Sequence, residues 1–398
     1  MIVKPRARGF ICTTAHPVGC AAAVREQIAY VRSQPTLADG PKNVLVIGCS
    51  AGYGLASRVS AAFGAGAKTL GVSFEKAPTE KRTASAGWYN NRAFEAEAEG
   101  AGLWAKTLDG DAFSDEMKAE VVALAKAELG PIDLVVYSLA SPVRTDPESG
   151  EQYRSAIKPV GEVFHVKTLN VDKPEVHEVD LEPATDEETA ATVKVMGGED
   201  WERWMRALGD AGVLADDCRT VAYTYIGSEL TWPIYWHATL GKAKEDLDRA
   251  AAAINAARGQ DGAARVAVLK AIVSQASAAI PVVPLYASIL FAVMKERGEH
   301  EEIWEHIHRM FATQLYPSAD GGGEVLDDVG RLRVDVPELS DPIQDEVKRR
   351  WPLVTTENLD ELTDFAGFRA DFFRIFGFGV DGVDYDAEVD PQSIEPPA

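Results

Sequence analysis

The sequence predicts an α/β fold built around a doubly wound parallel sheet, and three observations lead to this prediction. Short apolar, β-branched runs alternate with helical patterns over residues 42–138. A glycine-rich turn at residues 48–54 follows the first run, and the alternation resumes near residue 220 after a long irregular stretch. Because parallel strands need crossover connections, this order indicates a parallel sheet covered by helices.

Six runs have the length and apolar character of buried strands, and the segments between them repeat apolar residues at helical spacing. The predicted strands are residues 42–47, 69–74, 103–107, 131–138, 220–226 and 265–273. The predicted helices are residues 55–63, 92–99, 117–129, 200–211 and 242–257.

Three other segments depart from this alternation. Residues 163–179 partly alternate apolar and polar side chains, which predicts an inserted antiparallel ribbon. Residues 358–379 contain six phenylalanines, a density that predicts docking onto the core. The acidic end after Asp384 is expected to be loosely ordered.

Composition narrows the classes of function. The net charge of −22 repels phosphate backbones, so no nucleic-acid partner is expected. The four cysteines form no C-x-x-C pair, and the first residues lack the apolar core of a signal peptide, so a cytoplasmic protein is expected. Residues 271–294 carry no charge, but Pro281 and Pro284 favour a buried strand, loop and helix over a membrane span.

The turn GCSAGYG at residues 48–54 has the spacing G-x3-G-x-G that is typical of short-chain dehydrogenases. Glycines between a strand and a helix permit a tight turn and let backbone N–H groups approach a pyrophosphate. No Gly-Lys-Ser/Thr follows, which excludes a P-loop. The turn therefore predicts a Rossmann-type dinucleotide site, and an ordinary glycine turn is the alternative.

Glu75 ends the second predicted strand, 21 residues after Gly54. A carboxylate in this place accepts hydrogen bonds from the adenosine ribose and repels a 2′-phosphate. The position favours NAD over NADP, although Lys76 is adjacent and a solvated strand end is the alternative interpretation.

Tyr235 and Lys244 form a candidate proton-donor pair late in the fold. A lysine charge stabilises a phenolate and can bind the nicotinamide ribose. The alternative is an aromatic anchor and a surface lysine. In a straight helix Lys242, seven residues after Tyr235, shares its face, whereas Lys244, nine residues after it, lies on the opposite face.

Longer blocks of sequence point to one family. These blocks are RGFICTTAHPVGC (8–20), GCSAGYGL (48–55), AGWYN (86–90), GDAFSD (110–115), VVYSLASPVR (135–144), YIG (225–227), TWPIYW (231–236), QAS (275–277) and VTTEN (354–358). In them the chain resembles, nearly from end to end, the FabV-type trans-2-enoyl reductases, which act on enoyl-acyl-carrier-protein or enoyl-CoA.

The resemblance implies one enlarged Rossmann domain over residues 1–398 rather than two domains. Its expected parts are an N-terminal arm (1–39), a first nucleotide-binding half (40–145), an insertion (146–218), a second half with the Tyr/Lys site and substrate loop (219–320) and a C-terminal cap (321–398). It also implies NADH as cofactor, without flavin. We expect no metal, and we expect a monomer.

The family's functional positions carry over to matching residues. Tyr235 is the implied proton donor, Lys244 its catalytic and cofactor-binding partner, and Tyr225 a substrate-binding residue. The remaining implied cofactor contacts are Gly48, Cys49, Ser50, Ala51, Gly52, Tyr53, Phe74, Glu75, Asp111, Ala112, Leu139, Ala140, Val273, Ser274 and Gln275.

Two positions depart from the family pattern. Many members have threonine where Ser274 stands, and the hydroxyl is retained. Many have a second lysine where Glu245 stands, which leaves the role of Lys242 open. Since the family favours Lys244, we expect Tyr235 to lie outside the regular helix that bears it, with Pro233 and Gly241 making an irregular entry.

The implied chemistry suits these residues. Hydride attack on the β-carbon of an unsaturated thioester places negative charge on the thioester oxygen, and a hydroxyl aimed there stabilises the transition state. The α-carbon is then protonated. The uncharged residues 276–294 are candidates for the wall of an acyl channel, or for simple core.

Other classes of protein remain as alternatives. Another short-chain dehydrogenase shares the fold but usually spaces its Tyr and Lys four residues apart. A non-catalytic NAD-binding regulator needs the glycine turn but neither Tyr235 nor Lys244. A metal enzyme is disfavoured because His306 and His308, two residues apart on a helix, diverge, which predicts a solvated charged face.

The sequence leaves open whether acyl-carrier protein or CoA carries the substrate, and which chain length is preferred. Acyl-carrier proteins are usually acidic, so docking on this acidic chain needs a local basic patch. Residues 348–350, Lys-Arg-Arg, are one candidate, with a solvated helix face as the alternative.

Overall fold

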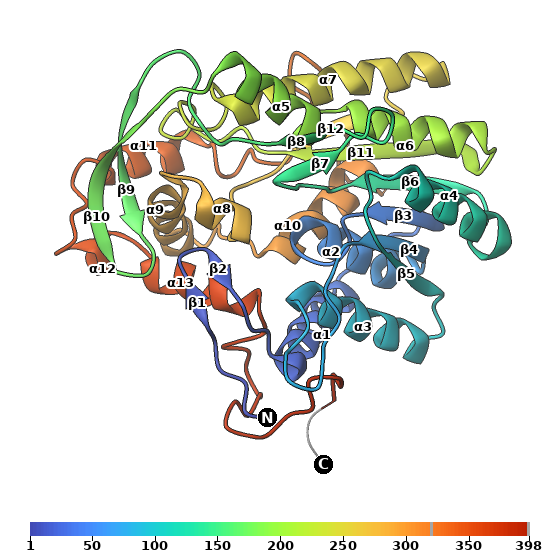
Figure 1. Cartoon of the computed structure of the whole chain (residues 1–398), viewed down its shortest axis with the longest axis horizontal. Coiled ribbons are helices and arrows are strands. Elements are labelled where there is room, and N and C mark those ends of the chain that lie inside the picture. Colours follow the sequence, from blue (N-terminus) through green and yellow to red (C-terminus); the bar gives the residue numbers. More distant parts are fainter. Residues whose placement is uncertain (319–320, 396–398) are drawn as a thin grey trace.

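The computed structural model describes residues 1–318 and 321–395. Its centre is a seven-stranded sheet in the order β13-β12-β11-β6-β3-β4-β5, with every neighbouring pair parallel (Figure 1). The strands are β3 (Asn43–Ile47), β4 (Lys68–Ser73), β5 (Ala105–Asp109), β6 (Ile132–Tyr137), β11 (Leu214–Thr224), β12 (Ala264–Val268) and β13 (Leu332–Arg333). The predicted doubly wound α/β fold is confirmed.

The strand order reverses between β3 and β6. From β3 the chain proceeds to β4 and β5 on one side of the sheet, and then to β6, β11, β12 and β13 on the other. In open parallel sheets a crevice forms at this point, outside the carboxyl ends of the strands, and ligands bind there. The glycine turn after β3 and the loop after β6 both open into this place.

Helices cover both faces of the sheet, because the side chains of each strand alternate between the faces. Val44, Val46 and Leu134 face helices α2 and α10, while Leu45 and Val135 face α4, α6 and α7. The helices are α1 (Pro17–Ser33), α2 (Gly52–Val59), α3 (Ala86–Gly100), α4 (Asp115–Leu124), α6 (Glu199–Asp210), α7 (Thr239–Arg258) and α10 (Ile303–Met310), with single turns of π-helix at η1 (Ser60–Gly64), η2 (Ala125–Leu129) and η3 (Phe311–Leu315).

The predicted antiparallel ribbon is present and lies at the end of the molecule remote from β5 (Figure 1). The same part of the chain also holds a small hairpin and one helix. These elements are β7 (Val143–Thr145), β8 (Gln152–Arg154), β9 (Phe164–Asn170), β10 (Glu175–Leu181) and α5 (Asp186–Met196). The N-terminal hairpin of β1 (Ala7–Arg8) and β2 (Ile11–Cys12) contacts the turn of the ribbon, where the Gly9 amide donates to Asp172.

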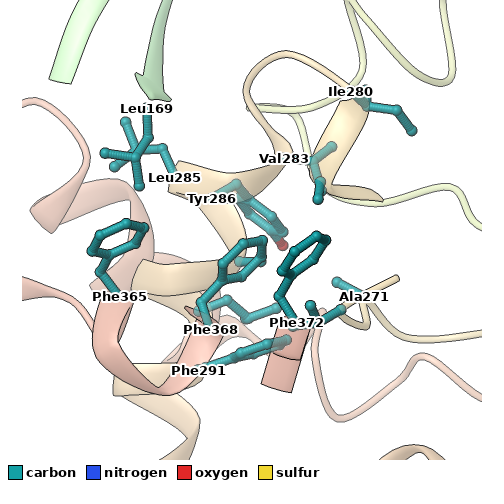
Figure 2. Close-up of a cluster of buried hydrophobic side chains, with 14 of the residues drawn as sticks. Leu169, Ala271, Ile280, Val283, Leu285, Tyr286, Phe291, Phe365, Phe368 and Phe372 are labelled. Atoms are coloured by element: carbon teal, nitrogen blue, oxygen red, sulfur yellow. The ribbon is translucent and has the colours of Figure 1, made fainter. Parts of the chain in front are cut away.

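A second cluster of helices packs beyond the carboxyl ends of the strands. Its members are α8 (Gln275–Ala279), α9 (Val283–Glu296), α11 (Asp341–Arg350), α12 (Leu359–Leu362) and α13 (Phe365–Arg374). Figure 2 shows Phe365, Phe368 and Phe372 of α13 directed at α9, beside Tyr286 and Phe291. The predicted docking of the phenylalanine-rich segment is confirmed. No helix within residues 1–318 and 321–395 is long and apolar enough to cross a membrane.

Two sequence-based expectations about strands and the C-terminal tail are wrong. The predicted strand 265–273 ends at Val268, because its last residues leave the sheet and turn into the cavity described below. The tail after Asp384 packs on the body instead of being loose: Val389 is buried and donates to the Met1 carbonyl, and Tyr89 donates to the Pro391 carbonyl at 2.6 Å.

A buried ion pair joins α4 to α6. The Lys118 ammonium lies 2.8 Å from the Asp200 carboxylate, and both side chains are almost fully buried. The same ammonium donates to the carbonyls of Ala112 and Phe113 and so fixes the loop after β5. The Tyr137 hydroxyl donates to the Asp200 carboxylate. The pair is therefore satisfied by hydrogen bonds on both sides.

Replacing one partner of this pair should destabilise the fold strongly. Lys118→Met leaves Asp200 buried without its counter-ion, so the free energy of unfolding should fall by about 3–5 kcal/mol in urea denaturation. Lys106→Met, which breaks a half-exposed pair with Glu128, is the matched control and should change it far less. Equal losses in the two variants would contradict this assignment.

Candidate active site

The glycine turn after β3 is shaped by close contacts that exclude side chains. A Cβ on Gly48, whose φ is +85°, would lie 2.0 Å from the Ser138 carbonyl oxygen, and a Cβ on Gly54 would lie 1.9 Å from the Gly48 oxygen. Around Gly52, at φ +53°, a Cβ would meet no atom within 4 Å. The turn is thus packed tightly on the sheet side and open on the other side.

The N-terminus of α2 is available to an anion. The N-cap residue Ala51 has extended backbone and supplies no side-chain hydrogen bond, and the first turn of the helix carries no acidic residue. The first N–H groups of a helix have no partner within it, and their dipoles favour a negative ligand. Together with the open side of Gly52, these amides fit a pyrophosphate.

Two carboxylates lie at one rim of the crevice. Glu75, two residues beyond β4, accepts a hydrogen bond from the Ser50 hydroxyl at 2.6 Å, and its own amide donates to Asp109 at 2.7 Å. Gly87 of α3 leaves room for the Glu75 carboxylate, since a Cβ there would lie 2.0 Å from it. The neighbouring Phe74 ring is 81% exposed and offers a flat apolar surface.

A cavity of about 860 Å³ extends from the glycine turn into the second cluster of helices. Its wall includes Tyr225, Tyr235 and Lys244, followed by the apolar side chains of Ile280 and Val283. The cavity therefore joins a dinucleotide-sized crevice to a pocket that suits an acyl chain.

Two tyrosines face each other in this cavity. Tyr225 directly follows β11, Tyr235 lies in the turns before α7, and their ring centroids are 4.9 Å apart at an interplanar angle of 85°. Burial raises the pKa of both phenols above the ordinary value. Both hydroxyls therefore stay protonated near neutral pH and can donate hydrogen bonds.

Tyr235 lies outside the regular helix that bears Lys244, as expected. Helix α7 begins at Thr239, and the Gly241 amide donates back to the Tyr235 carbonyl at 2.9 Å. A Cβ on Gly241 would lie 1.7 Å from the Trp236 oxygen, so only glycine allows the preceding turn to fold against the helix. The straight-helix argument for Lys242 consequently does not apply.

The two lysines have different surroundings. Lys244 lines the cavity, and burial lowers its pKa to about 8. Lys242 is exposed and forms an ion pair with Glu245 at 2.9 Å. Of these two lysines, only Lys244 lines the cavity together with Tyr235.

Of the residues predicted as site residues, all but one line this cavity. The exception is Cys49, whose buried thiol lies 3.6 Å from the Asn91 side-chain oxygen, behind the glycine turn. Its backbone amide donates to the Val72 carbonyl at 3.1 Å. The others are Gly48, Ser50, Ala51, Gly52, Tyr53, Phe74, Glu75, Asp111, Ala112, Leu139, Ala140, Tyr225, Tyr235, Lys244, Val273, Ser274 and Gln275.

Sequence reasoning missed two charged residues at the site. Lys270, buried just after β12, lines the cavity and donates to the Glu301 carbonyl; a charged residue at the end of a buried strand was the available signal. Glu338 is fully buried and accepts a hydrogen bond from Tyr225. No local pattern marks Glu338, because it meets Tyr225 only through the fold.

The predicted solvated face around His306 and His308 is wrong, since both imidazoles are buried. Helix α10 is enclosed by α1 and α2, so residues on two sides of it are covered. His306 accepts from the Lys270 amide at 3.2 Å and pairs with Glu301 at 2.9 Å, and burial lowers its pKa to about 4. The described residues contain no group of three or more side chains that could hold a metal ion.

Three family models match this chain. Residues 82–316 match the trans-2-enoyl-CoA reductase catalytic region, and residues 2–80 match the NAD(P)H binding domain of trans-2-enoyl-CoA reductase. Residues 326–389 match a model described as an enoyl reductase FAD binding domain. The segment of this third match supplies Asp371, Arg374 and Ile375 to the lining of the cavity.

Curated relatives match over nearly the whole length. The chain is 58% identical, over 98% of both chains, to the enoyl-[acyl-carrier-protein] reductase [NADH] of Edwardsiella ictaluri. It is equally similar, with the same coverage, to the enzyme named enoyl-[acyl-carrier-protein] reductase [NADH] FabV of Aeromonas salmonicida.

Solved structures match as well. The Treponema denticola trans-2-enoyl-CoA reductase in complex with NAD superimposes with a TM-score of 0.94 at 50% identity, covering 98% of both chains. The Clostridium acetobutulicum trans-2-enoyl-CoA reductase in complex with NADH gives 0.94 at 43% identity over 100% of both. The chain belongs to the trans-2-enoyl-CoA reductase family. The FabV-type resemblance of the sequence blocks is confirmed, and the cavity is the candidate active site of this family member.

The lowered pKa of Lys244 predicts an unusual reactivity towards amine reagents. Acetylation of Lys244, measured by mass spectrometry in short pulses at increasing pH, should rise with a midpoint near pH 8, because only the neutral amine reacts. Lys242 serves as the internal comparison. If Lys244 becomes reactive at no lower pH than Lys242, then burial does not shift its pKa.

Proposed function

We propose that this protein reduces the C2=C3 double bond of trans-2-enoyl thioesters with NADH, in fatty acid synthesis. The observation that carries the proposal is one continuous cavity, lined by the glycine turn at one end and by Tyr235, Tyr225 and Lys244 further in. Family membership and relatives that are named as NADH-dependent enoyl reductases support it.

The residues present fit NADH. The open amides at the start of α2 would hold the pyrophosphate, and Glu75 would accept from the adenosine ribose hydroxyls. Lys244 would contact the nicotinamide ribose. When bound, NADH supplies the hydride that reduces the β-carbon.

The chain's own groups then handle charge and protons. As the β-carbon gains a hydride, the electron pair of the double bond moves to the thioester oxygen, and the Tyr235 hydroxyl donates to that oxygen. The Lys244 ammonium, which lines the same cavity, favours this developing charge. Proton delivery to the α-carbon completes the saturated thioester, so one hydride and one proton are added in total. Ile280 and Val283 line the apolar part of the cavity next to this place and exclude water from the acyl chain.

Further features belong to the proposal. Residues from Ala23 to Ile375 of one chain line the cavity, which supports a single enlarged domain that functions as a monomer. The charge of −22 supports an enzyme without a nucleic-acid partner, and the four free cysteines support a cytoplasmic location. The basic residues 348–350 each pair with an acid, namely Glu229, Glu346 and Glu296, so they offer acyl-carrier protein no free basic patch.

The direct test measures NADH oxidation with crotonyl-CoA, followed by the same acyl chain on acyl-carrier protein. Turnover that depends on both NADH and the enoyl thioester is expected. NADH binding without turnover on either carrier would favour a non-catalytic regulator, and activity on alcohols or ketones alone would favour another dehydrogenase.

The coenzyme preference should depend on Glu75. A 2′-phosphate would be placed beside Glu75 and Asp109, so kcat/KM with NADH should exceed that with NADPH by more than about a hundredfold. Glu75→Ala should reduce the ratio of kcat/KM with NADH to kcat/KM with NADPH. Equal kcat/KM for the two coenzymes in the unaltered protein would contradict this role.

Removing the Tyr235 hydroxyl should lower turnover far more than it weakens coenzyme binding. Because the hydroxyl meets charge that exists mainly in the transition state, Tyr235→Phe should reduce kcat by about 100-fold or more. NADH affinity, followed by fluorescence, should change little. Near-native turnover in this variant would transfer the role to Tyr225.

Replacing Lys244 and replacing Lys242 should have different effects on NADH affinity and kcat. Lys244→Ala removes the only one of the pair that lines the cavity, so both NADH affinity and kcat should fall sharply. Lys242→Ala, the matched control on the exposed side of α7, should keep most of the activity. The reverse pattern would overturn the assignment.

A further inference from the structure

A buried carboxyl group lies directly behind Tyr225, outside the cavity. Glu338, five residues beyond β13, is fully buried. One of its oxygens accepts from the hydroxyls of Tyr225 at 3.0 Å and Tyr286 at 2.9 Å, and the other accepts from the Ala271 amide at 2.6 Å. Within residues 1–318 and 321–395, no lysine, arginine or histidine forms an ion pair with it.

We propose that Glu338 is a positioning residue that sets the direction in which the Tyr225 hydroxyl points its hydrogen. It thereby decides whether Tyr225 can donate a hydrogen bond to the substrate. The inference rests on the proposed reductase function, and its site of action is the thioester oxygen. Burying an acid that only neutral donors contact costs stability. Acids with such surroundings are concentrated at functional sites.

The geometry separates the two tyrosines that Glu338 contacts. The Gln344 amide donates to the Tyr286 oxygen at 3.1 Å, so the proton of Tyr286 is directed at Glu338. Tyr225 instead lines the cavity beside Tyr235. Its single proton can point either to Glu338 or into the cavity, but not to both.

The protonation of Glu338 decides between these two arrangements. As a carboxylate, Glu338 accepts a hydrogen bond from Tyr225, so the hydroxyl hydrogen of Tyr225 points away from the cavity. As a carboxylic acid it donates its own proton to the Tyr225 oxygen, and the Tyr225 proton becomes free to bind the developing oxyanion. The neutral form is therefore the active one.

The surroundings place this change near neutral pH. Burial raises the pKa of Glu338 to about 7, and the nearby Asp335 carboxyl raises it too, while the hydrogen bonds from Ala271, Tyr286 and Tyr225 lower it. Below about pH 7 the acid predominates, and above it the carboxylate. The charged and titratable groups around it are Lys270 after β12, Tyr53 on α2, Tyr235 before α7, Tyr286 on α9, Tyr225 after β11, and Asp335, itself paired with Arg333.

The test compares pH profiles of kcat/KM with crotonyl-CoA at saturating NADH. In the unaltered protein the value should fall about tenfold as pH rises through 7, mainly in kcat, because one transition-state donor is lost. Glu338→Gln keeps the shape but cannot titrate, so its profile should lack this fall near pH 7, while the fall that comes from Lys244, whose pKa is about 8, should stay in both proteins. A fall near pH 7 that persists in Glu338→Gln overturns the inference.

Two further variants keep the test decisive. Asp371→Asn removes another carboxyl, a partly buried one that lines the cavity, whose pKa is also raised to about 7, chiefly by burial. The fall in kcat/KM near pH 7 should remain in Asp371→Asn. Its loss in that variant would assign the fall to Asp371 instead of Glu338. Tyr225→Phe should lose the fall in kcat/KM near pH 7, and the double variant with Glu338→Gln should have the same pH profile as Tyr225→Phe alone. A fall near pH 7 that is retained in Tyr225→Phe also overturns the inference, even if Glu338→Gln does not fold.

The outcomes distinguish this inference from the proposed function. If the unaltered protein oxidises no NADH with an enoyl thioester, the proposed function fails. If it does so with a profile that is flat near pH 7, the function stands and the inference about Glu338 fails alone.

Discussion

The close approach of the two loops at the centre of the sheet is the constraint on which the site depends. The turn after β3 and the loop after β6 meet where the strand order reverses, with no space for a side chain between Gly48 and the Ser138 carbonyl. Because the sheet side of the turn is filled, its free amides can only face outward. The position of the nucleotide site, and of the cavity that continues from it, follows from that contact.

Desolvation sets the chemical state of the groups along this cavity. Burial raises the pKa of Tyr235 and lowers that of Lys244 to about 8, so the phenol keeps its proton, while the ammonium is destabilised but still predominates at pH 7. Neither effect requires a counter-ion at the site. A cavity with apolar walls and few charges is suited to stabilising an oxyanion that exists only during the reaction, since fixed donors act strongly in a low-dielectric space.

The irregular entry to α7 distinguishes this enzyme's geometry from the short-chain pattern of four residues between Tyr and Lys. A turn packed against Gly241 places Tyr235 beside the cavity, and Lys244 reaches the same wall from the helix. Spacing along the chain reports relative direction only within one regular helix. Once the two residues belong to different local structures, a spacing of nine becomes compatible with a shared site.

The sequence by itself determined six of the seven strands, their helical crossovers and the glycine turn, because strand and helix periodicity and a strand–turn–helix glycine pattern are local properties. The long family blocks also allowed the site positions to be named one by one, and all but the Cys49 side chain line the cavity. Boundaries and surroundings were less accessible, as the early end of β12 and the buried His306 demonstrate. Only the tertiary structure brought Glu338 to Tyr225 across 113 residues and covered α10 on more than one side. Burial and long-range hydrogen bonds are decided by which surfaces pack together, and no window of local sequence contains that information.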